Sequence, residues 1–355
     1  MATEQIDTAR AEEFAGEMIG VLNSGMTGLL VSIGHRLGLF DSLAGLPPSR
    51  TDEIARATGL NERYIREWAK GLTVAGVLVH DGEADTYTLP PEHAAALTRA
   101  AGPDNVATLA QYIGLFGEVE DPVIECFRNG GGVPYSAYPR FQALQAEETA
   151  QVYDAALVNG VVPIVPGLTE RLEQGIDAID VGCGQGHAVN VLAQAFPNSR
   201  FTGRDISAEG IAAAREEATA LGLRNARFEQ ASVTDIDGEY DLVTAFDVIH
   251  DLADPAGALA GIAQAVKPGG AFLMVDIAGS SDVDRNTEHP LGPALYTVSL
   301  MHCMTVSLAQ GGAGLGTMWG EELAQQMLAD AGFTNVAVEH VDGDFFNVYY
   351  VCSKD

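Results

Sequence analysis

The sequence predicts an α/β protein in two parts, a helical N-terminal region followed by a doubly wound parallel sheet. Two observations lead to this prediction. The chain has 355 residues, a length that commonly corresponds to about two domains. From Ile176 onward, short apolar runs suited to strands alternate with helical segments. That alternation is typical of a parallel sheet with helices on both faces.

The composition is that of a globular protein with a strong negative charge. There are 19 Lys and Arg against 49 Asp and Glu, which gives a formal net charge of −30 at pH 7. A charge of this sign repels polyanions, so we expect no nucleic-acid partner and no docking on anionic membranes. The sequence shows neither a signal-peptide pattern nor an apolar run of about 18 residues. We therefore expect a cytoplasmic protein without a membrane span.

Cysteine spacing predicts neither disulfides nor a metal site. The four cysteines are Cys126, Cys183, Cys303 and Cys352. They lie far apart, and no C-x-x-C or Cys/His spacing occurs. Closely spaced ligands of that kind are what a zinc site or a disulfide framework would show.

Residues 1–100 follow the pattern of a winged-helix domain. Apolar residues at helical spacing predict helices over residues 11–22 and 29–43. Two shorter helices, residues 53–58 and 63–75, each end at a glycine. A small two-stranded wing over residues 77–89 follows them.

Charge decides between two interpretations of this domain. The first interpretation is DNA binding, because the second short helix carries Arg63, Arg66 and Lys70. The same helix also carries Glu62 and Glu67, and the wing adds three acids that would repel phosphates. We therefore interpret residues 1–100 as an interaction or dimerisation module.

Residues 101–170 are expected to form a helical linker or cap. A loop over residues 129–139 interrupts it, with three consecutive glycines followed by Tyr135 and Tyr138. This loop is either a surface connector or a cover that closes over a ligand, with the two tyrosines as walls. The residues themselves leave both interpretations open.

Seven apolar runs predict the strands of the C-terminal domain, residues 171–355. They are residues 178–181, 200–205, 226–230, 240–246, 271–277, 336–340 and 347–352. Residues 267–270, Lys-Pro-Gly-Gly, predict a tight turn before the fifth strand. A long interruption separates the fifth strand from the sixth.

The central motif follows the first of these strands and reads Asp-Val-Gly-Cys-Gly-Gln-Gly from Asp180 to Gly186. Alternating glycines let the backbone turn sharply and let a ligand approach the main chain. The helix that follows offers free N–H groups and a partial positive charge. Asp180 would disfavour a pyrophosphate but suits a ligand with an ammonium group, as in S-adenosylmethionine.

A second acid and a third loop extend this candidate site. Asp205 lies 19 residues after Gly186, at the end of the second strand. A carboxylate there can accept both hydroxyls of a ribose. The loop over residues 230–235, after the third strand, could present backbone N–H groups to an adenine; otherwise it is an ordinary strand-to-helix connection.

Together these motifs resemble class I S-adenosylmethionine-dependent methyltransferases over residues 160–355. The matching residues are Asp180-x-Gly182-x-Gly184-x-Gly186, Gly203-x-Asp205, Phe246-Asp247-x-x-His250 and Lys267-Pro268-Gly269-Gly270. With the winged helix added, the whole chain resembles the small-molecule O-methyltransferases of plants and bacteria, and actinobacterial relatives. The resemblance implies a Rossmann-like sheet in the order 3-2-1-4-5-7-6 with an antiparallel seventh strand. It also implies a homodimer formed through N-terminal helices.

The resemblance implies S-adenosylmethionine as cofactor, and it implies which residues bind this molecule. They are Asp180, Gly182, Gly184, Gly186, Asp205, Ile206, Ser232, Val233 and Phe246. The acid and the glycines would hold the methionine part, Asp205 the ribose, residues 232 and 233 the adenine, and the Phe246 carbonyl the amino group. Relatives often carry an acid at position 232, where this chain has Ser.

The candidate catalytic residue is His250, which follows the fourth strand at the carboxyl edge of the sheet. A neutral imidazole near pH 7 can remove the proton of an acceptor hydroxyl. In plant O-methyltransferases a His-Asp pair at the matching position, here His250 and Asp251, is the general base. In many bacterial relatives this His only packs against the cofactor loop, and both interpretations stay open.

The long interruption is an apolar, Met-rich segment over residues 291–309, followed by a glycine loop over residues 311–316. We expect it to line an acceptor pocket for a small, hydrophobic or aromatic molecule, methylated on oxygen. The expected pocket residues are Tyr135, Tyr138, Tyr296, Ser299, His302 and Met304. His302 is the alternative base, and a core or interface helix is the alternative interpretation. No acid pair has the spacing of metal-dependent catechol-type enzymes, so we expect no metal.

Two other functions remain compatible with these motifs. The first is a ligand-sensing regulator that uses the winged helix. The second is an enzyme with the same cofactor fold that no longer transfers a methyl group.

Overall fold

The computed structural model describes residues 6–341, 344 and 346–354. The chain divides into two compact units, Met1–Gly117 and Glu118–Asp355. The sequence predicts a boundary near residue 100 and a separate region over residues 101–170, whereas the structure divides that stretch between the two units. Packing explains the difference, because α6 (Gln111–Gly117) lies along α1 (Thr8–Arg36) in the first unit.

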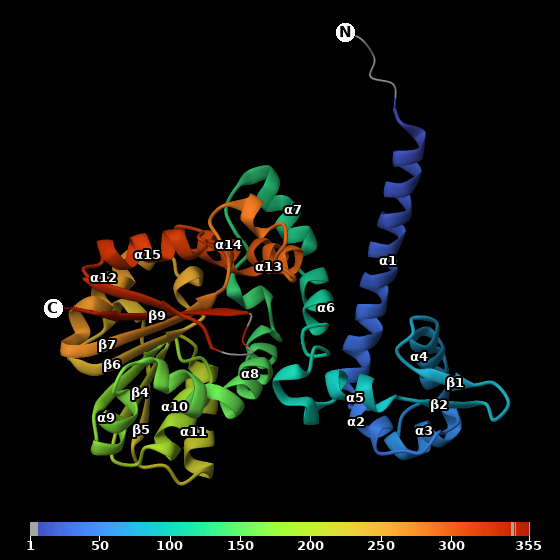
Figure 1. Ribbon diagram of the computed structural model, residues 1–355, viewed down its shortest axis with the longest axis horizontal. Helices are drawn as coiled ribbons and strands as arrows, with labels where there is room; N and C mark the ends of the chain where they lie inside the picture. Colours follow the sequence, from blue (N-terminus) through green and yellow to red (C-terminus); the bar gives the residue numbers. More distant parts are fainter. Residues whose placement is uncertain (1–5, 342–343, 345, 355) are drawn as a thin grey trace. The chain divides into compact units, whose positions relative to one another are not determined.

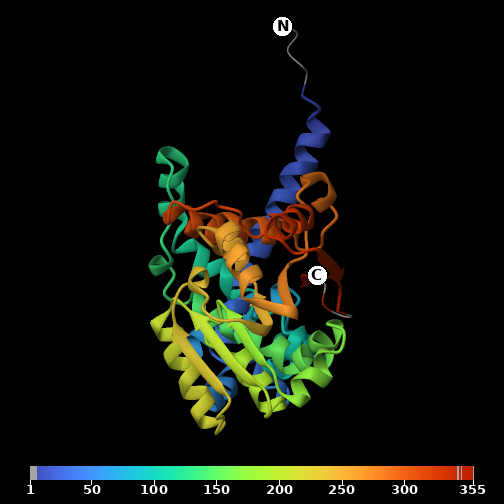
Figure 2. The same cartoon turned by 90° about the vertical axis from the view of Figure 1, so that its left-hand side faces the viewer.

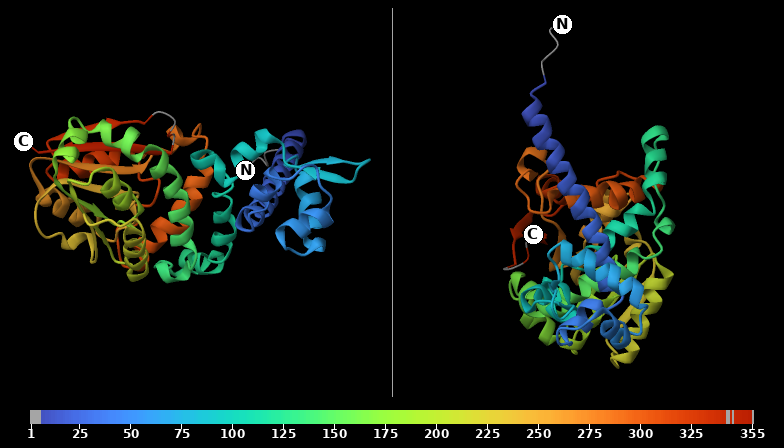
Figure 3. Two further views of the ribbon diagram at one scale, coloured as in Figure 1. Left: turned by 90° about the horizontal axis from the view of Figure 1, so that it is seen from below. Right: turned by 90° about the vertical axis from the view of Figure 1, so that its right-hand side faces the viewer.

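The N-terminal unit contains the expected winged helix. Asn61 caps the second short helix, since its side-chain oxygen accepts the Arg63 N–H at 3.0 Å. The wing is an antiparallel hairpin, drawn in cyan in Figure 3. The elements are α2 (Leu39–Ala44), α3 (Thr51–Thr58), α4 (Glu62–Val74), β1 (Val79–Asp81), β2 (Thr86–Thr88), α5 (Pro91–Leu97) and the 3₁₀ segment η1 (Arg99–Asp104).

The charged residues of α4 are paired with one another. Arg66 contacts Glu62 at 2.6 Å, and Arg63 pairs with Glu67 one turn further along. The two arginines that would suit a DNA-reading helix are therefore engaged by carboxylates of their own helix. This pairing agrees with the interaction module inferred from the charge pattern.

α1 is a single helix of 29 residues, where the sequence predicts two separate helices. Figure 3 shows it as one continuous blue helix. Phe14, Val21 and Met26 are each more than half exposed on it. By length and composition α1 could cross a membrane, whereas the sequence predicts no membrane span. Only 6% of the most apolar stretch of α1 is buried. An exposed apolar side of this kind commonly marks an interaction surface.

The C-terminal unit is built on a seven-stranded sheet with the order β5-β4-β3-β6-β7-β9-β8. In the order of the strands along the domain this is 3-2-1-4-5-7-6, and β9 is antiparallel to both of its neighbours. The expected sheet is therefore confirmed. The strands are β3 (Asp177–Val181), β4 (Arg200–Asp205), β5 (Ala226–Gln230), β6 (Tyr240–Phe246), β7 (Val266–Ile277), β8 (Asn335–Glu339) and β9 (Asn347–Ser353).

Helices cover both faces of the sheet, as Figure 1 shows. α10 (His187–Ala195) and α11 (Ala208–Ala220) share one apolar core with the sheet, and α9 (Leu168–Gln174) joins it. α12 (Pro255–Ala265) and α15 (Glu321–Asp330) form the other core. The central strands β3, β6 and β7 are mostly buried, which explains why they appear in the sequence as continuous apolar runs.

The expected turn at residues 267–270 lies inside a longer strand. β7 begins at Val266, which pairs with Tyr240, and the register then shifts so that Leu242 pairs with Ala271. The extra residues form a bulge, and Gly269 has a φ of +74°. The sequence pattern marks the irregularity correctly but places it before the strand instead of within it.

Two groups of helices lie at the carboxyl ends of β6 and β7. The first is a cap with α7 (Glu120–Asn129), α8 (Phe141–Val152), the π-helical segment η3 (Tyr153–Val161) and the 3₁₀ turns η2 (Tyr135–Ala137) and η4 (Val162–Ile164). The second is the insertion, with η7 (Val283–Asn286), α13 (Gly292–Val298), the π-helical turn η8 (Ser299–Cys303) and α14 (Met304–Ala309). Figures 1 and 2 show α7 beside the insertion.

Candidate active site

The loop between β3 and α10 holds the three glycines of the central motif. All three have positive φ angles, including +53° at Gly184 and +72° at Gly186. A Cβ at Gly186 would come within 2.5 Å of Ala214 and Phe228, whereas a Cβ at Gly184 would meet nothing within 4 Å. Gly186 therefore permits close packing of α10, and Gly184 leaves open space in which a ligand can lie against the main chain. Gly182 packs tightly against Val248.

Asp205, at the end of β4, is held in place beside this loop. Its Oδ2 accepts the Gly184 N–H at 2.9 Å, and its Oδ1 accepts the Ser207 N–H at 2.7 Å. Each carboxylate oxygen can accept a further hydrogen bond. The fixed carboxylate can therefore also accept the two hydroxyls of a ribose.

Asp180 is a buried carboxylate that lacks a positive partner among the described contacts. It is 5% exposed in β3, and its Oδ1 accepts the Thr244 hydroxyl of β6 at 2.7 Å. Burial raises the pKa of Asp180 to about 7; the Thr244 hydrogen bond opposes this shift, and the charge of Asp205 adds to it. A buried carboxylate is costly unless it is paired. This pocket is therefore suited to a cationic group.

The other expected cofactor residues lie at the carboxyl ends of β4, β5 and β6. Ile206 follows β4 and is 64% exposed. Ser232 caps the 3₁₀ turn η5 (Val233–Asp235) with its own hydroxyl, while the Val233 side chain is buried in the core. Phe246 ends β6 and packs on Tyr153, with ring centroids 5.4 Å apart.

His250 lies in the 3₁₀ turn η6 (Ile249–Asp251), just after β6. Its Nδ1 is 2.8 Å from Oδ1 of Asp276, at the end of β7. Because a carboxylate can only accept, Nδ1 carries a proton in this pair. Trp319 Nε1 donates to the same oxygen at 3.0 Å and holds Asp276 in place. The orienting carboxylate is thus Asp276, where the resemblance pairs His250 with Asp251.

Asp251 lies between the two histidines that the sequence offers as bases. Its Oδ1 is 3.4 Å from His250 Nε2, and its Oδ2 is 3.9 Å from His302 Nδ1. Asp251 Oδ1 and His302 Nε2 are buried and have no hydrogen-bond partner among the described residues. The structure therefore brings His250, Asp251 and His302 together.

The two histidines differ in their affinity for a proton. Burial by itself lowers the pKa of His250, but the carboxylates of Asp276 and Asp251 outweigh it and raise this pKa well above its usual value. Burial lowers the pKa of His302 to about 4, despite the charge of Asp251. The charged form of His250 is therefore favoured, and this residue can act as a base only when Nε2 has lost its proton, whereas His302 is neutral at pH 7.

His302 forms the centre of an aromatic cluster. The Phe141 ring stacks on it at 3.5 Å with an interplanar angle of 8°, and the rings of Tyr135 and Tyr138 meet its edges at 5.5 Å and 4.8 Å. Burial raises the pKa of Tyr135, as do the charges of Asp251 and then Asp205. Tyr135 therefore lies within the electrostatic reach of both acids.

The glycine and tyrosine loop is fastened to the insertion. Val133 N donates to the Thr305 hydroxyl at 2.9 Å, and the Tyr138 hydroxyl donates to the Met301 carbonyl at 2.5 Å. A Cβ at Gly132 would come within 2.0 Å of the Thr305 carbonyl oxygen. This loop therefore lies against the insertion in the described structure, and only a glycine permits that approach.

The remaining expected pocket residues lie elsewhere on the insertion. The Tyr296 hydroxyl accepts from Asn286 at 3.0 Å, which ties it to η7. Ser299 and Met304 lie against Gly316 of the glycine loop. The Gly316 N–H in turn donates to the His250 carbonyl at 3.3 Å. These contacts connect the insertion directly to the segment that carries His250.

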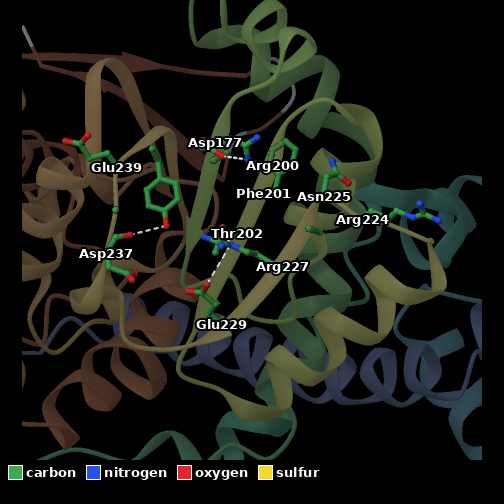
Figure 4. A pocket seen from close by; sticks show the side chains of 14 residues that line it. Asp177, Arg200, Phe201, Thr202, Arg224, Asn225, Arg227, Glu229, Asp237 and Glu239 are labelled. Atoms are coloured by element: carbon green, nitrogen blue, oxygen red, sulfur yellow. Dashed lines mark hydrogen bonds and ion pairs between the residues drawn. The ribbon is translucent and has the colours of Figure 1, made fainter.

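A separate hollow of about 530 Å³ lies at the opposite end of the sheet. Figure 4 shows the side chains that line it. It is lined by residues at the starts of β3, β4 and β5, among them Asp177 and Arg200, which pair at 2.7 Å. Doubly wound sheets bind ligands at the carboxyl ends of their strands. This hollow is therefore distinct from the candidate active site.

Sequence reasoning missed several residues of the site. Asp276 lies near the end of β7, an apolar strand next to β6. An acid at that position could have been predicted from the sequence to lie at the same edge of the sheet as His250. Trp319 and Phe141 carried no such signal, because only tertiary packing brings them to His250 and His302. Asp247 was also missed as a side chain: its φ is +53°, and burial, with the charge of Asp276, raises its pKa to about 8.

The fold and the site define a class of protein, the class I methyltransferase fold preceded by a winged helix. Residues 25–99 match the family described as the Rv2258c-like winged HTH domain, and residues 172–332 match the family described as a methyltransferase domain. The chain is therefore similar to one family in each of these two stretches.

Individual relatives agree with this assignment. A stretch of 104 residues is 35% identical to trans-aconitate 2-methyltransferase of Deinococcus radiodurans, covering 29% of this chain and 38% of that protein. The chain matches between 23% and 38% of the length of the first curated relatives.

Solved structures show the same fold over the whole chain. Human N-acetylserotonin methyltransferase in complex with SAM has a TM-score of 0.71 at 19% identity, and each chain is covered completely. An O-methyltransferase family protein from Burkholderia thailandensis has a TM-score of 0.70 at 17% identity, covering 96% of this chain and 98% of that one. At these identities the likeness shows the fold alone.

Proposed function

We propose that the protein transfers a methyl group from S-adenosylmethionine to a hydroxyl of a small acceptor. The observation that carries this proposal is the His250–Asp276 pair, which orients the imidazole at the carboxyl edge of β6, next to the acid and glycine loop. An oriented base beside a cofactor site is what methyl transfer to a hydroxyl requires.

The chain's residues fit S-adenosylmethionine. The buried Asp180 carboxylate suits the α-ammonium, the fixed Asp205 carboxylate suits the ribose hydroxyls, and open space at Gly184 suits close approach to the main chain. Bound there, S-adenosylmethionine supplies a methyl group activated by its sulfonium. The chain has to hold the acceptor in line with that methyl and remove the acceptor's proton.

The proton passes from the acceptor hydroxyl to Nε2 of His250. The imidazolium that forms has its Nδ1–H directed at Asp276, whose negative charge stabilises it. Trp319 keeps the carboxylate in position. Asp251, 3.4 Å from Nε2, adds a second negative charge beside the new cation. No metal ion is needed for this transfer.

The acceptor is a small, hydrophobic or aromatic molecule. The aromatic cluster of Tyr135, Tyr138, Phe141 and His302 lies close to Asp251, and Tyr135 is its exposed member, at 37%. Curated relatives named ubiquinone biosynthesis O-methyltransferase share about a third of their aligned residues with this chain over roughly 100 residues. A phenolic or quinone-like acceptor fits this aromatic cluster.

Methyl-labelled S-adenosylmethionine offered with a panel of phenolic and quinone-like acceptors tests the proposal. We expect label to enter an acceptor at an oxygen atom, and we expect a chelator to leave the rate unchanged. Label that enters no acceptor, although S-adenosylmethionine binds, would favour an enzyme that no longer transfers methyl groups. A strict requirement for magnesium would refute the proposed proton transfer without metal.

We also propose that the protein is a cytoplasmic homodimer in which a second copy covers the apolar side of α1. Exposed apolar residues on α1, such as Phe14 and Met26, support a protein partner, and the net charge of −30 opposes an anionic membrane. Light scattering should give the mass of a dimer, and the double variant Phe14→Ser, Met26→Ser should give the mass of a monomer. Flotation of the protein with anionic vesicles would instead indicate that α1 binds a membrane.

We expect no binding to duplex DNA, because Arg63 and Arg66 are already paired.

A further inference from the structure

Three potential metal ligands meet at the acceptor side of the site. They are His250, Asp251 and Cys303, and one ligand atom from each lies within 4.8 Å of the others. The first two come from η6 and the third from the π-helical turn η8. No short sequence spacing connects these segments, which is why the sequence predicts no metal site.

The environment of His250 is the one that metal-binding histidines use. Its Nδ1–H is directed at the Asp276 carboxylate, and its Nε2 lies 3.4 Å from Asp251 Oδ1. A carboxylate behind the imidazole orients the ring and makes Nε2 a better donor to a metal ion. This geometry is present before any ligand is added.

One polar atom of the cluster has no hydrogen bond in the described part of the chain. Asp251 Oδ1 is buried and lies 3.4 Å from His250 Nε2. His302 faces the cluster with Nδ1, which is 3.9 Å from Asp251 Oδ2 and 3.6 Å from Cys303 Sγ. Buried polar atoms without partners are uncommon, and an absent ligand is one of their standard explanations.

The chemistry of the ligands selects the kind of ion. Imidazole nitrogen, carboxylate oxygen and thiolate sulfur are the ligands of zinc, whereas magnesium prefers oxygen alone. Binding of the ion therefore releases the proton of the Cys303 thiol to solvent. Ligands at about 2.0–2.3 Å from a tetrahedral zinc ion lie roughly 3.3–3.8 Å apart. The cluster therefore has to contract by about 1 Å, and three protein ligands leave a fourth position for water.

We propose that His250, Asp251 and Cys303 form an inhibitory binding site for a thiophilic divalent ion of the zinc class. The ion takes the Nε2 lone pair that the proposed methyl transfer needs for the acceptor proton. The inhibitory part rests on the proposed function, whereas the binding site itself does not.

Cobalt(II) serves as the probe for binding, because a cobalt–thiolate bond gives a charge-transfer absorption. The full-length protein, freed of metals by a chelator, is titrated with cobalt chloride. We expect the absorption in the wild type, its loss in Cys303→Ser and its retention in Cys126→Ser, which removes a thiol of α7 outside the cluster. Zinc added afterwards should abolish it. Retained binding of S-adenosylmethionine shows that Cys303→Ser is folded.

The outcomes separate the two levels of the proposal. No absorption in the wild type, or an absorption that survives Cys303→Ser, overturns the metal site. If the site exists, equimolar zinc should suppress methyl transfer in the wild type and in Cys126→Ser but much less in Cys303→Ser. Transfer that zinc leaves unchanged overturns the inhibitory role. If the protein transfers no methyl group, the proposed function is wrong. The cobalt absorption alone then tests whether the metal site exists.

Discussion

The polar atoms of the site are satisfied differently on its proposed cofactor side, around Asp180 and Asp205, and on its proposed acceptor side, around His250, Asp251, Asp276 and His302. On the cofactor side, both oxygens of Asp205 accept backbone N–H groups and Asp180 accepts a hydroxyl. On the acceptor side, atoms of Asp251, Asp276 and His302 are buried without a partner in the described structure. The first side is prepared by its own backbone, whereas the second is completed only by what binds there.

This difference shows how the site divides its tasks. A binding surface for a constant cofactor can be built from one strand-turn-helix unit and the next strand. The acceptor surface has to combine a base, its orienting acid and aromatic walls, which come from η6, β7, the cap and the insertion. Substitutions on the two sides should therefore affect different measured quantities.

The largest expected effect is that of His250→Gln on the acceptor side. Glutamine keeps a polar side chain of similar reach but cannot accept the proton, so kcat should fall by about 10²–10⁴-fold. The Kd for S-adenosylmethionine, measured by calorimetry, should stay unchanged. Unchanged turnover would remove His250 from the mechanism and would leave the adjacent His302 as the base.

Asp276→Asn should have the next largest effect. The variant loses the charge that stabilises the imidazolium and holds the His250 tautomer, so kcat should fall by about 10–100-fold. Trp319→Phe is the matched control, since it removes only the second donor to Asp276 and should cost less. Equal losses in both variants would mean that the packing of β7, not the charge, determines the rate.

Asp180→Asn tests the cofactor side and should weaken S-adenosylmethionine binding by about 10–100-fold, because a charge-assisted contact is lost. In the wild type the affinity should rise with pH up to about pH 7, where Asp180 ionises, and binding below that pH should release a proton. Calorimetry in buffers of different ionisation enthalpy measures both effects. A pH-independent affinity would place the ammonium elsewhere.

The raised pKa of Asp180 also makes the stability of the folded protein depend on pH. The folded pKa of Asp180 lies above its value in the unfolded chain, so its contribution is present at low pH and is lost as the pH rises through about 7. In the absence of ligand, Asp180→Asn should therefore gain stability relative to the wild type between pH 5 and pH 8. Thermal unfolding at these two pH values checks the sign.

The smallest expected effect is that of Phe141→Leu, which removes the ring stacked on His302. Stacked aromatic pairs contribute about 0.5–1.5 kcal/mol beyond their buried area, so the KM for an aromatic acceptor should rise by roughly 2–10-fold. Phe196→Leu, in the core between the sheet and α10, should instead lower the melting temperature and leave this KM unchanged. A change in the Kd for S-adenosylmethionine would show that the two sides are coupled.

Local patterns in the sequence determined the strands and the glycine loop after the first strand of the sheet. The family resemblance supplied the order of the strands. Apolar runs buried on both faces leave a clear signal, and the acid, the glycines and Asp205 act through the backbone next to them. The sequence predicted two shorter helices in place of α1. The continuity of α1 and the exposure of its apolar side depend on the tertiary structure around it, and apolar periodicity alone does not determine them.

Only the tertiary structure decided how the acceptor side is built. Asp276, not the adjacent Asp251, orients His250, because neighbouring parallel strands bring their carboxyl ends together. Phe141, His302 and Cys303 reach the same place from the cap and the insertion. Contacts between distant segments leave no spacing in a sequence, whereas a strand, its turn and the next helix do.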